Sequence, residues 1–149
     1  MLFCQSSSIA LSSPQHSSFC KMRIFPCRLR PGNDVRKSLE TLVARCNIKA
    51  GIILTSVGSL SKVVVRLSND KVKTFSGNFE ILSLAGTLSV EGAHLHICFS
   101  DKEGKAFGGH LKPGSIVYTT AEIVIGDIEN CVFRRKPDQK TGFDELEFQ

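Results

Sequence analysis

Short runs of apolar residues, interrupted by glycine, asparagine or aspartate, occupy most of the chain after residue 50. Many of these runs are rich in valine, isoleucine and threonine, as in VVVRL and TTAEIVI, and β-branched residues favour strands. The spacing of the turn-forming residues therefore predicts a series of strands with short connections. The expected strands cover residues 23–30, 50–57, 61–67, 71–75, 79–89, 93–99, 105–111, 115–125 and 131–135.

One stretch before these runs has a helical period. Its apolar residues recur at spacings of three and four, which places them on one face of an α-helix. They are Val35, Leu39, Leu42, Val43 and Cys46. The preceding turn, 31–34 (PGND), offers an N-cap, and Asn47 and Gly51 are suitable stop signals. One main packed helix beside a largely antiparallel sheet is an α+β fold.

The length of the chain favours one domain. Its 149 residues, of which 42% are hydrophobic and 22% charged, are enough for a single core. We expect this domain at residues 23–136, between a serine-rich leader at 1–22 and a flexible polar tail at 137–149. No apolar run approaches the roughly 20 residues of a transmembrane helix, so we expect a cytoplasmic or nuclear protein without a membrane partner. An organellar location stays open if the leader is a targeting peptide rather than an extension before Met22.

Basic charge is concentrated at the beginning of the chain. The net charge is +5, but six of the 19 lysines and arginines precede residue 38 with one acidic residue among them, and the remainder is balanced. A basic folded face for nucleic acid is therefore not indicated. The six cysteines form no CxxC pair, and a chain of this size does not need disulfide bonds for stability, so we expect reduced thiols.

Three of the four histidines lie between residues 92 and 111. His94 and His96 are two apart in an expected strand, so their side chains leave the sheet on the same face, opposite to Leu95 and Ile97. That spacing suits a shared metal ion, although a polar strand face can carry such a pair without any metal. Whether His110 joins them depends on the turn between the two strands.

The turn at 101–104 (DKEG) determines the register of this hairpin. If Gly104 is left-handed in a three-residue loop with a G1 bulge, Asp101 pairs with Lys105 and His110 lies opposite His96. A four-residue loop without the bulge shifts the register by one and turns His110 to the other face. An irregularity at the glycines 108–109 changes the phase in the same way.

In the first register the three imidazoles share one face and can bind a common ion. Zinc or a similar divalent metal suits three neutral nitrogens, and an open fourth position is typical of catalytic zinc. The alternative is a polar strand face with three hydrogen-bonded histidines. Glu122 lies in another apolar strand, where it is a candidate catalytic base, a partner for a histidine, or an exposed edge residue.

Several ordered motifs in this sequence resemble the PPC domain, the plant and prokaryote conserved domain. The motifs are 28–32 (RLRPG), 49–51 (KAG), 56–60 (SVGSL), 77–86 (GNFEILSLAG), 94–96 (HLH), 108–111 (GGHL) and 120–122 (TAE). Together they extend the resemblance over residues 23–135. The resemblance implies a mixed fold with a largely antiparallel sheet, a packed helix and assembly into a homotrimer.

The resemblance also suggests site residues. The PPC fold is similar to a wider group that contains acetolactate decarboxylase, in which an HxH pair and a later histidine hold zinc, and this implies His94, His96 and His110 as metal ligands. In plant members an AT-hook that binds DNA precedes the domain, and a Gly-Arg-Phe-Glu-Ile-Leu stretch binds partners. The matching partner-binding residues are Gly77, Asn78, Phe79, Glu80, Ile81 and Leu82, with asparagine in place of the arginine. Segment 28–31 (RLRP) lacks the glycine of an AT-hook, so no DNA-binding residues are assigned.

Three functions are to be distinguished. The favoured one is a stand-alone, self-assembling PPC module that binds protein partners, regulatory or associated with DNA, and carries the three-histidine metal site. The alternative is a metal-dependent lyase or hydrolase that acts on a small carbonyl or ester substrate, with Glu122 as the base. The third is direct DNA binding, which predicts an affinity that falls steeply with salt.

Overall fold

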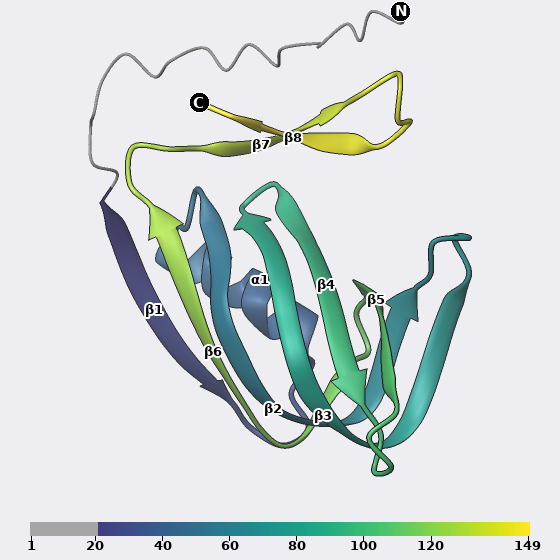
Figure 1. Ribbon diagram of the computed structural model, residues 1–149. Coiled ribbons are helices and arrows are strands. Elements are labelled where there is room, and N and C mark those ends of the chain that lie inside the picture. Colours follow the sequence, from purple (N-terminus) through teal and green to yellow (C-terminus); the bar gives the residue numbers. More distant parts are fainter. Residues whose placement is uncertain (1–20) are drawn as a thin grey trace, which may run out of the picture.

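The computed structural model describes residues 21–149, in which a curved six-stranded antiparallel sheet surrounds one helix (Figure 1). The strand order is β1-β6-β2-β3-β4-β5, and a separate two-stranded sheet, β7-β8, follows. The α+β prediction is confirmed. The elements are β1 (Met22–Leu29), α1 (Val35–Cys46), β2 (Gly51–Arg66), β3 (Val72–Ser89), β4 (Gly92–Ser100), β5 (Ala106–Leu111), β6 (Ile116–Ile128), β7 (Phe133–Pro137) and β8 (Asp144–Phe148).

The helix begins and ends where the local sequence predicts. Asp34 is the N-cap, and its carboxylate accepts hydrogen bonds from the backbone N–H groups of Lys37, at 3.1 Å, and Gly114, at 2.7 Å. Asn47 ends the helix in the left-handed conformation, with φ 49°. The predicted apolar face is confirmed, since Val35 and Leu39 are fully buried against the sheet.

Two predicted pairs of short strands are continuous strands instead. We expected breaks near residues 58–60 and 76–78, but β2 has 16 residues and β3 has 18. The pairing of β2 with β3 and β6 shifts register between Leu60 and Lys62. The small residues at 58–61 therefore produce β-bulges that bend the strand without ending it.

The curvature of the sheet brings β5 to the far end of β2. Besides pairing with β4, β5 pairs with β2 through Val65–Leu111 and Arg66–His110. The enclosed core is apolar, and Phe99 is fully buried within it with its ring edge-on to Phe75. His110 consequently lies between two strands, with His96 on one side and Arg66 on the other.

The C-terminal residues 137–149, expected to be a flexible polar tail, contain β8, which forms a hairpin with β7. Strand β8 pairs with β7 over five residue pairs, and Lys136 of β7 forms an ion pair with Glu147 of β8. The hairpin lies at one end of the main sheet (Figure 1). The N–H of Phe133 donates to the carbonyl of Lys49 at 3.0 Å, and Arg134 pairs with Glu91. Because these contacts join distant segments, the polar composition of the segment did not reveal them.

The leader prediction for residues 1–22 falls almost entirely outside the described residues, which begin at Lys21. Within residues 21–149, Cys27, Cys46, Cys98 and Cys131 are free thiols. The same part of the chain contains no helix long and apolar enough to cross a membrane.

Candidate metal centre

The turn between β4 and β5 has the three-residue geometry with a left-handed glycine. The N–H of Asp101 donates to the carbonyl of Lys105 at 3.1 Å, and the N–H of Gly104 donates to the carbonyl of Asp101 at 3.0 Å. Gly104 has φ 80°, a conformation that costs glycine little because it has no Cβ. The side chain of Asp101 also accepts from the N–H groups of Glu103 and Lys105, which fastens the turn.

This turn sets the register that places the histidines together. His96 pairs directly with His110, and the ladder continues to Ser100 and Ala106 without a shift. The glycines 108–109 are ordinary members of the ladder, so the phase change considered from sequence does not occur. The prediction that the three histidines share one face is confirmed.

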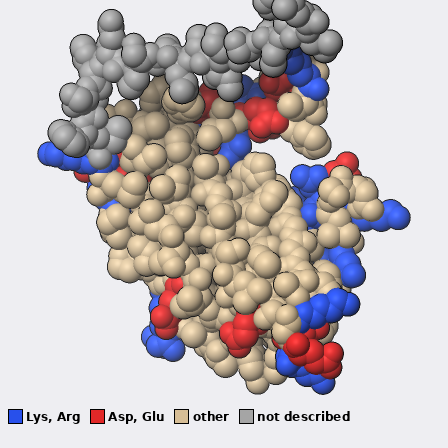
Figure 2. All heavy atoms as spheres, in the orientation of Figure 1, with Lys and Arg blue, Asp and Glu red and all other residues tan. Residues whose placement is uncertain are grey.

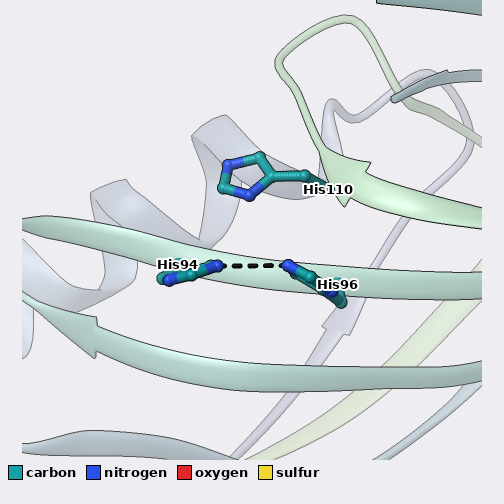
Figure 3. Close-up of side chains that lie close together, drawn as sticks. All are labelled: His94, His96 and His110. Atoms are coloured by element: carbon teal, nitrogen blue, oxygen red, sulfur yellow. Dashed lines mark hydrogen bonds between the residues drawn. The ribbon is translucent and has the colours of Figure 1, made fainter. Parts of the chain in front are cut away.

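The three imidazole rings surround a common point. Ring centroids are 5.1 Å apart for His94 and His96, 4.9 Å for His94 and His110, and 5.5 Å for His96 and His110. The Nε2 atoms of His94 and His96 are 3.1 Å apart, and one nitrogen from each of the three residues lies within 4.8 Å of the others. Figure 3 shows a ring nitrogen of His110 pointing toward the His94–His96 pair.

Arg36 of the helix holds the two strands beside the rings. Its side chain is only 14% exposed, and its Nη2 donates to the carbonyl of Ala93 at 2.9 Å while Nη1 donates to the carbonyl of Leu111 at 2.8 Å. Those carbonyls belong to the residues next to His94 and His110. Arg36 therefore fixes the relative position of β4 and β5 just beyond the last ladder pair.

The environment favours neutral imidazoles. Burial is the main cause that lowers the pKa of His94, and the neighbouring charge of His96 acts in the same direction. Burial, followed by the charges of His94 and Arg66, lowers the pKa of His110 to about 4. Because metals bind the neutral ring, these two histidines are ready to act as ligands at neutral pH.

Protonation of His110 is expected to destabilise the metal-free fold. Folding lowers the pKa of this imidazole from its ordinary value of 6.5 to about 4. Above pH 6.5 the ring is neutral in both the folded and the unfolded chain, so the fold has its full stability. As the pH falls toward 4, the unfolded chain binds the proton more readily, and this stability is lost. The cations that face the ring, on Arg36, Arg66 and Lys112, act in the same direction as burial. Because solvent screens the charge of a partly exposed ring, we expect the free energy of unfolding to fall by about 1 kcal/mol.

Urea unfolding in the presence of a chelator, at several pH values from 7 to 4, measures this effect. The free energy of unfolding of the parent should fall more steeply than that of His110→Gln, which has no imidazole to protonate. Parallel curves for the two proteins would show that His110 does not contribute.

Cavities adjoin each pair of histidines. One of about 310 Å³ is lined by His94 and His110, one of about 470 Å³ by His96 and His110, and one of about 420 Å³ by His94 and His96. The space around the common point is therefore open for a further ligand. A site of this kind permits binding of a small molecule beside an ion.

Glu122 is not close to the histidines within one protomer. It is an exposed residue of β6, paired with Arg28 of β1 and Val57 of β2. Strands β2 and β3 separate β6 from β4 in the sheet, and none of the three cavities beside the histidines is lined by Glu122. Its catalytic role stays a prediction.

The proposed partner-binding segment lies within β3 and divides between core and surface. Phe79 and Ile81 are 7% and 6% exposed and belong to the core. Gly77, Asn78, Glu80 and Leu82 are exposed. A partner at this segment would therefore contact only the second group.

Sequence reasoning did not identify three charged residues beside the site, namely Arg36, Arg135 and Glu145. Arg36 was assigned to a helix and gave no sign of reaching β4 and β5. Arg135 and Glu145 lie in a segment whose docking on the sheet is a tertiary feature. No local pattern in the sequence points to any of them.

One curated relative is a much longer protein. The chain is 41% identical over 144 residues to the bifunctional protein GlmU of Synechococcus sp. (strain JA-3-3Ab), an alignment that covers 95% of this chain and 23% of that protein. The chain therefore spans less than a quarter of the length of this relative.

Three solved structures have the same fold. A hypothetical protein from Salmonella cholerae-suis is 37% identical, with a TM-score of 0.86 over 90% of this chain and 98% of that chain. A PPC protein from Pyrococcus horikoshii is 25% identical, with a TM-score of 0.74 over 89% and 96%. A metal-containing protein from Archaeoglobus fulgidus is 23% identical, with a TM-score of 0.71 over 84% and 93%.

The match to a family model covers most of the folded chain. The model describes the Plants and Prokaryotes Conserved (PCC) domain and matches residues 16–129, which contain β1 to β6 and all three clustered histidines. The chain belongs to the PCC-domain family, also called PPC, as the resemblance in its motifs predicted.

Proposed function

We propose that this chain is a self-assembling PCC-domain module that holds one divalent metal ion, zinc or similar, on His94, His96 and His110. The observation that carries the proposal is the convergence of three imidazole nitrogens within 4.8 Å of one another on one sheet face. When bound, such an ion supplies a Lewis acid and a site for a further ligand.

The donor atoms of His94 and His96 have the spacing of zinc ligands, and His110 offers a third nitrogen within 4.8 Å of them. Two nitrogens each 2.0–2.1 Å from tetrahedral zinc are about 3.3 Å apart, and the Nε2 atoms of His94 and His96 are 3.1 Å apart. Among the described residues, Nδ1 of His110 is buried and has no hydrogen-bond partner. A buried nitrogen without a partner is unfavourable, and an ion would satisfy it.

Self-assembly is supported by an uncharged surface. Figure 2 shows a broad area without Lys, Arg, Asp or Glu over β6, β2 and β3. Exposed apolar side chains between 44% and 56% accessible lie on these strands and on β1; they are Ile24, Leu54, Val57, Leu82 and Tyr118. An apolar area of this kind is typical of a protein interface, and we assign it to copies of the chain in a homotrimer.

A second candidate is a metal-dependent lyase or hydrolase for a small carbonyl or ester substrate. The cavity of about 310 Å³ that His94 and His110 line favours it, because it adjoins the proposed ion. Glu122 would act as base in this reaction only from a neighbouring copy. Within a protomer, β2 and β3 separate it from His94 and His96, and it pairs with β2 at Val57, far along that strand from Arg66, which pairs with His110.

Direct DNA contact has less support. In the basic cluster at 134–136, Arg134 pairs with Glu91, Lys136 pairs with Glu147, and Arg135 donates to the hydroxyl of Thr87. Two of the three cations are therefore already ion-paired, which weakens their contribution to phosphate binding. A nucleic-acid role would therefore depend on a partner protein.

Metal analysis of the purified protein tests the proposal. The parent should contain or take up one zinc per chain, whereas His94→Ala and His110→Ala should lose it while sedimentation shows an unchanged assembly. Glu122→Gln is the matched control and should keep its metal. Equal metal content in the parent and both histidine variants would rule out the site.

A further inference from the structure

The C-terminal hairpin is anchored beside the histidines. Nη2 of Arg135 donates to Oγ1 of Thr87 at 2.6 Å, and Thr87 is the direct cross-strand partner of His94. The backbone N–H of Arg135 donates to Oε2 of Glu91 at 2.9 Å. These contacts dock the β7–β8 hairpin against the strand pair that carries the first histidine.

Glu145 of this hairpin borders the site on two sides. It lines the cavity that His94 shares with His110 and also the cavity that His94 shares with His96. A carboxylate therefore borders both cavities that His94 lines.

The carboxylate of Glu145 has no ion-pair partner within residues 21–149. Of the neighbouring acids, Glu91 pairs with Arg134 and Glu147 pairs with Lys136. Asp144 has no ion pair within residues 21–149 either, but it lines only one of the two cavities beside His94. The charge of Glu145 is therefore available to a cation at the histidines. Three guanidinium groups, those of Arg36, Arg66 and Arg135, line the cavity of about 310 Å³ and would repel such a cation.

We propose that Glu145 is the acidic partner of the three-histidine site and that the β7–β8 hairpin is a wall of that site. This inference rests on the proposed metal-binding function. The carboxylate offsets the repulsion between a dication and the surrounding arginines, and outer carboxylates commonly strengthen metal sites in this way. The hairpin lies after residue 129, where the family match ends, so this chain supplies the acidic group from a segment outside the matched domain.

The affinity of the metal-free full chain for Zn²⁺, measured by competition with a chromophoric chelator, tests the proposal. Glu145→Gln removes the charge and keeps the size of the side chain. It should lower the affinity about 10–100-fold and accelerate removal of the metal by the chelator. Glu145→Asp keeps the charge and should retain most of the affinity.

Two matched variants control for a general effect of charge. Glu147→Gln removes a carboxylate that already pairs with Lys136. Glu103→Gln removes an exposed carboxylate in the β4–β5 turn, at the opposite end of these strands from the His96–His110 pair. Both should bind Zn²⁺ within about twofold of the parent, and all variants should show the parental circular dichroism.

The outcomes separate this inference from the proposed function. Parental affinity in Glu145→Gln, with binding still dependent on His94, overturns the role of Glu145 and leaves the metal site. An equal loss in Glu103→Gln also overturns it, since the effect is then one of net charge. A parent that binds no Zn²⁺ through the histidines overturns the proposed function and this inference together.

Discussion

Gly86→Ala is expected to lower the free energy of unfolding by about 3–6 kcal/mol and to weaken zinc binding severely. Gly86 lies in β3 and pairs with Leu95, between His94 and His96 of β4. A Cβ at this position would overlap the backbone carbonyl oxygen of His94 and lie 3.0 Å from Cα of Leu95. The strand that presents His94 and His96 would have to move.

Gly77→Ala separates the two causes of this loss, which are the unfavourable φ of a residue with a side chain and the overlap of its Cβ with β4. Gly77 has the same φ of 142° in the same strand, but a Cβ there would come no closer than 3.6 Å to any atom, on the ring of Phe79. It should carry only the conformational cost, about 1–3 kcal/mol, and bind zinc normally. Urea unfolding and zinc titration of both variants measure the difference, and equal losses would show that overlap with β4 is unimportant.

Zinc should raise the melting temperature of the parent by about 8–16 °C when present at 1,000 times its dissociation constant. Binding to the folded state alone adds about 4 kcal/mol at that concentration, and a chain of this size gains about 2–4 °C per kcal/mol. The effect should be absent in His96→Ala. Because the side chain of His96 is exposed, its removal should have little effect on the stability of the metal-free fold.

Thermal unfolding with and without ZnCl₂ measures this shift. Mg²⁺ is the control ion, since it prefers oxygen ligands and should leave the melting temperature unchanged. A full zinc shift in His96→Ala would place the bound ion elsewhere on the protein.

Local chemistry was sufficient to predict the helix, and it limited the hairpin that carries the site to a few registers, of which the structure has the one with a left-handed Gly104. The apolar spacing from Val35 to Cys46 determines a helical face, and Asp34 and Asn47 provide its caps. The DKEG turn determines the register of β4 and β5, and alternation then places His94, His96 and His110 on one face. These features depend on residues within a few positions of one another, so they can be inferred without knowing what surrounds them.

Contacts between distant segments could not be inferred in this way. Whether the residues at 58–61 end β2 or bend it depends on the strands that pair with them on both sides. The docking of the C-terminal hairpin depends on Glu91, Thr87 and Lys49, all more than 40 residues away.

The same distinction applies to the candidate site. Sequence periodicity brought three imidazoles to one side of a hairpin because side-chain direction in a strand alternates with every residue. Only tertiary packing places Arg36 of the helix and Glu145 of the C-terminal hairpin beside these rings. It also places Glu122 away from them. Alternation and turn chemistry act over a few residues, whereas the surroundings of the rings depend on how the whole curved sheet closes.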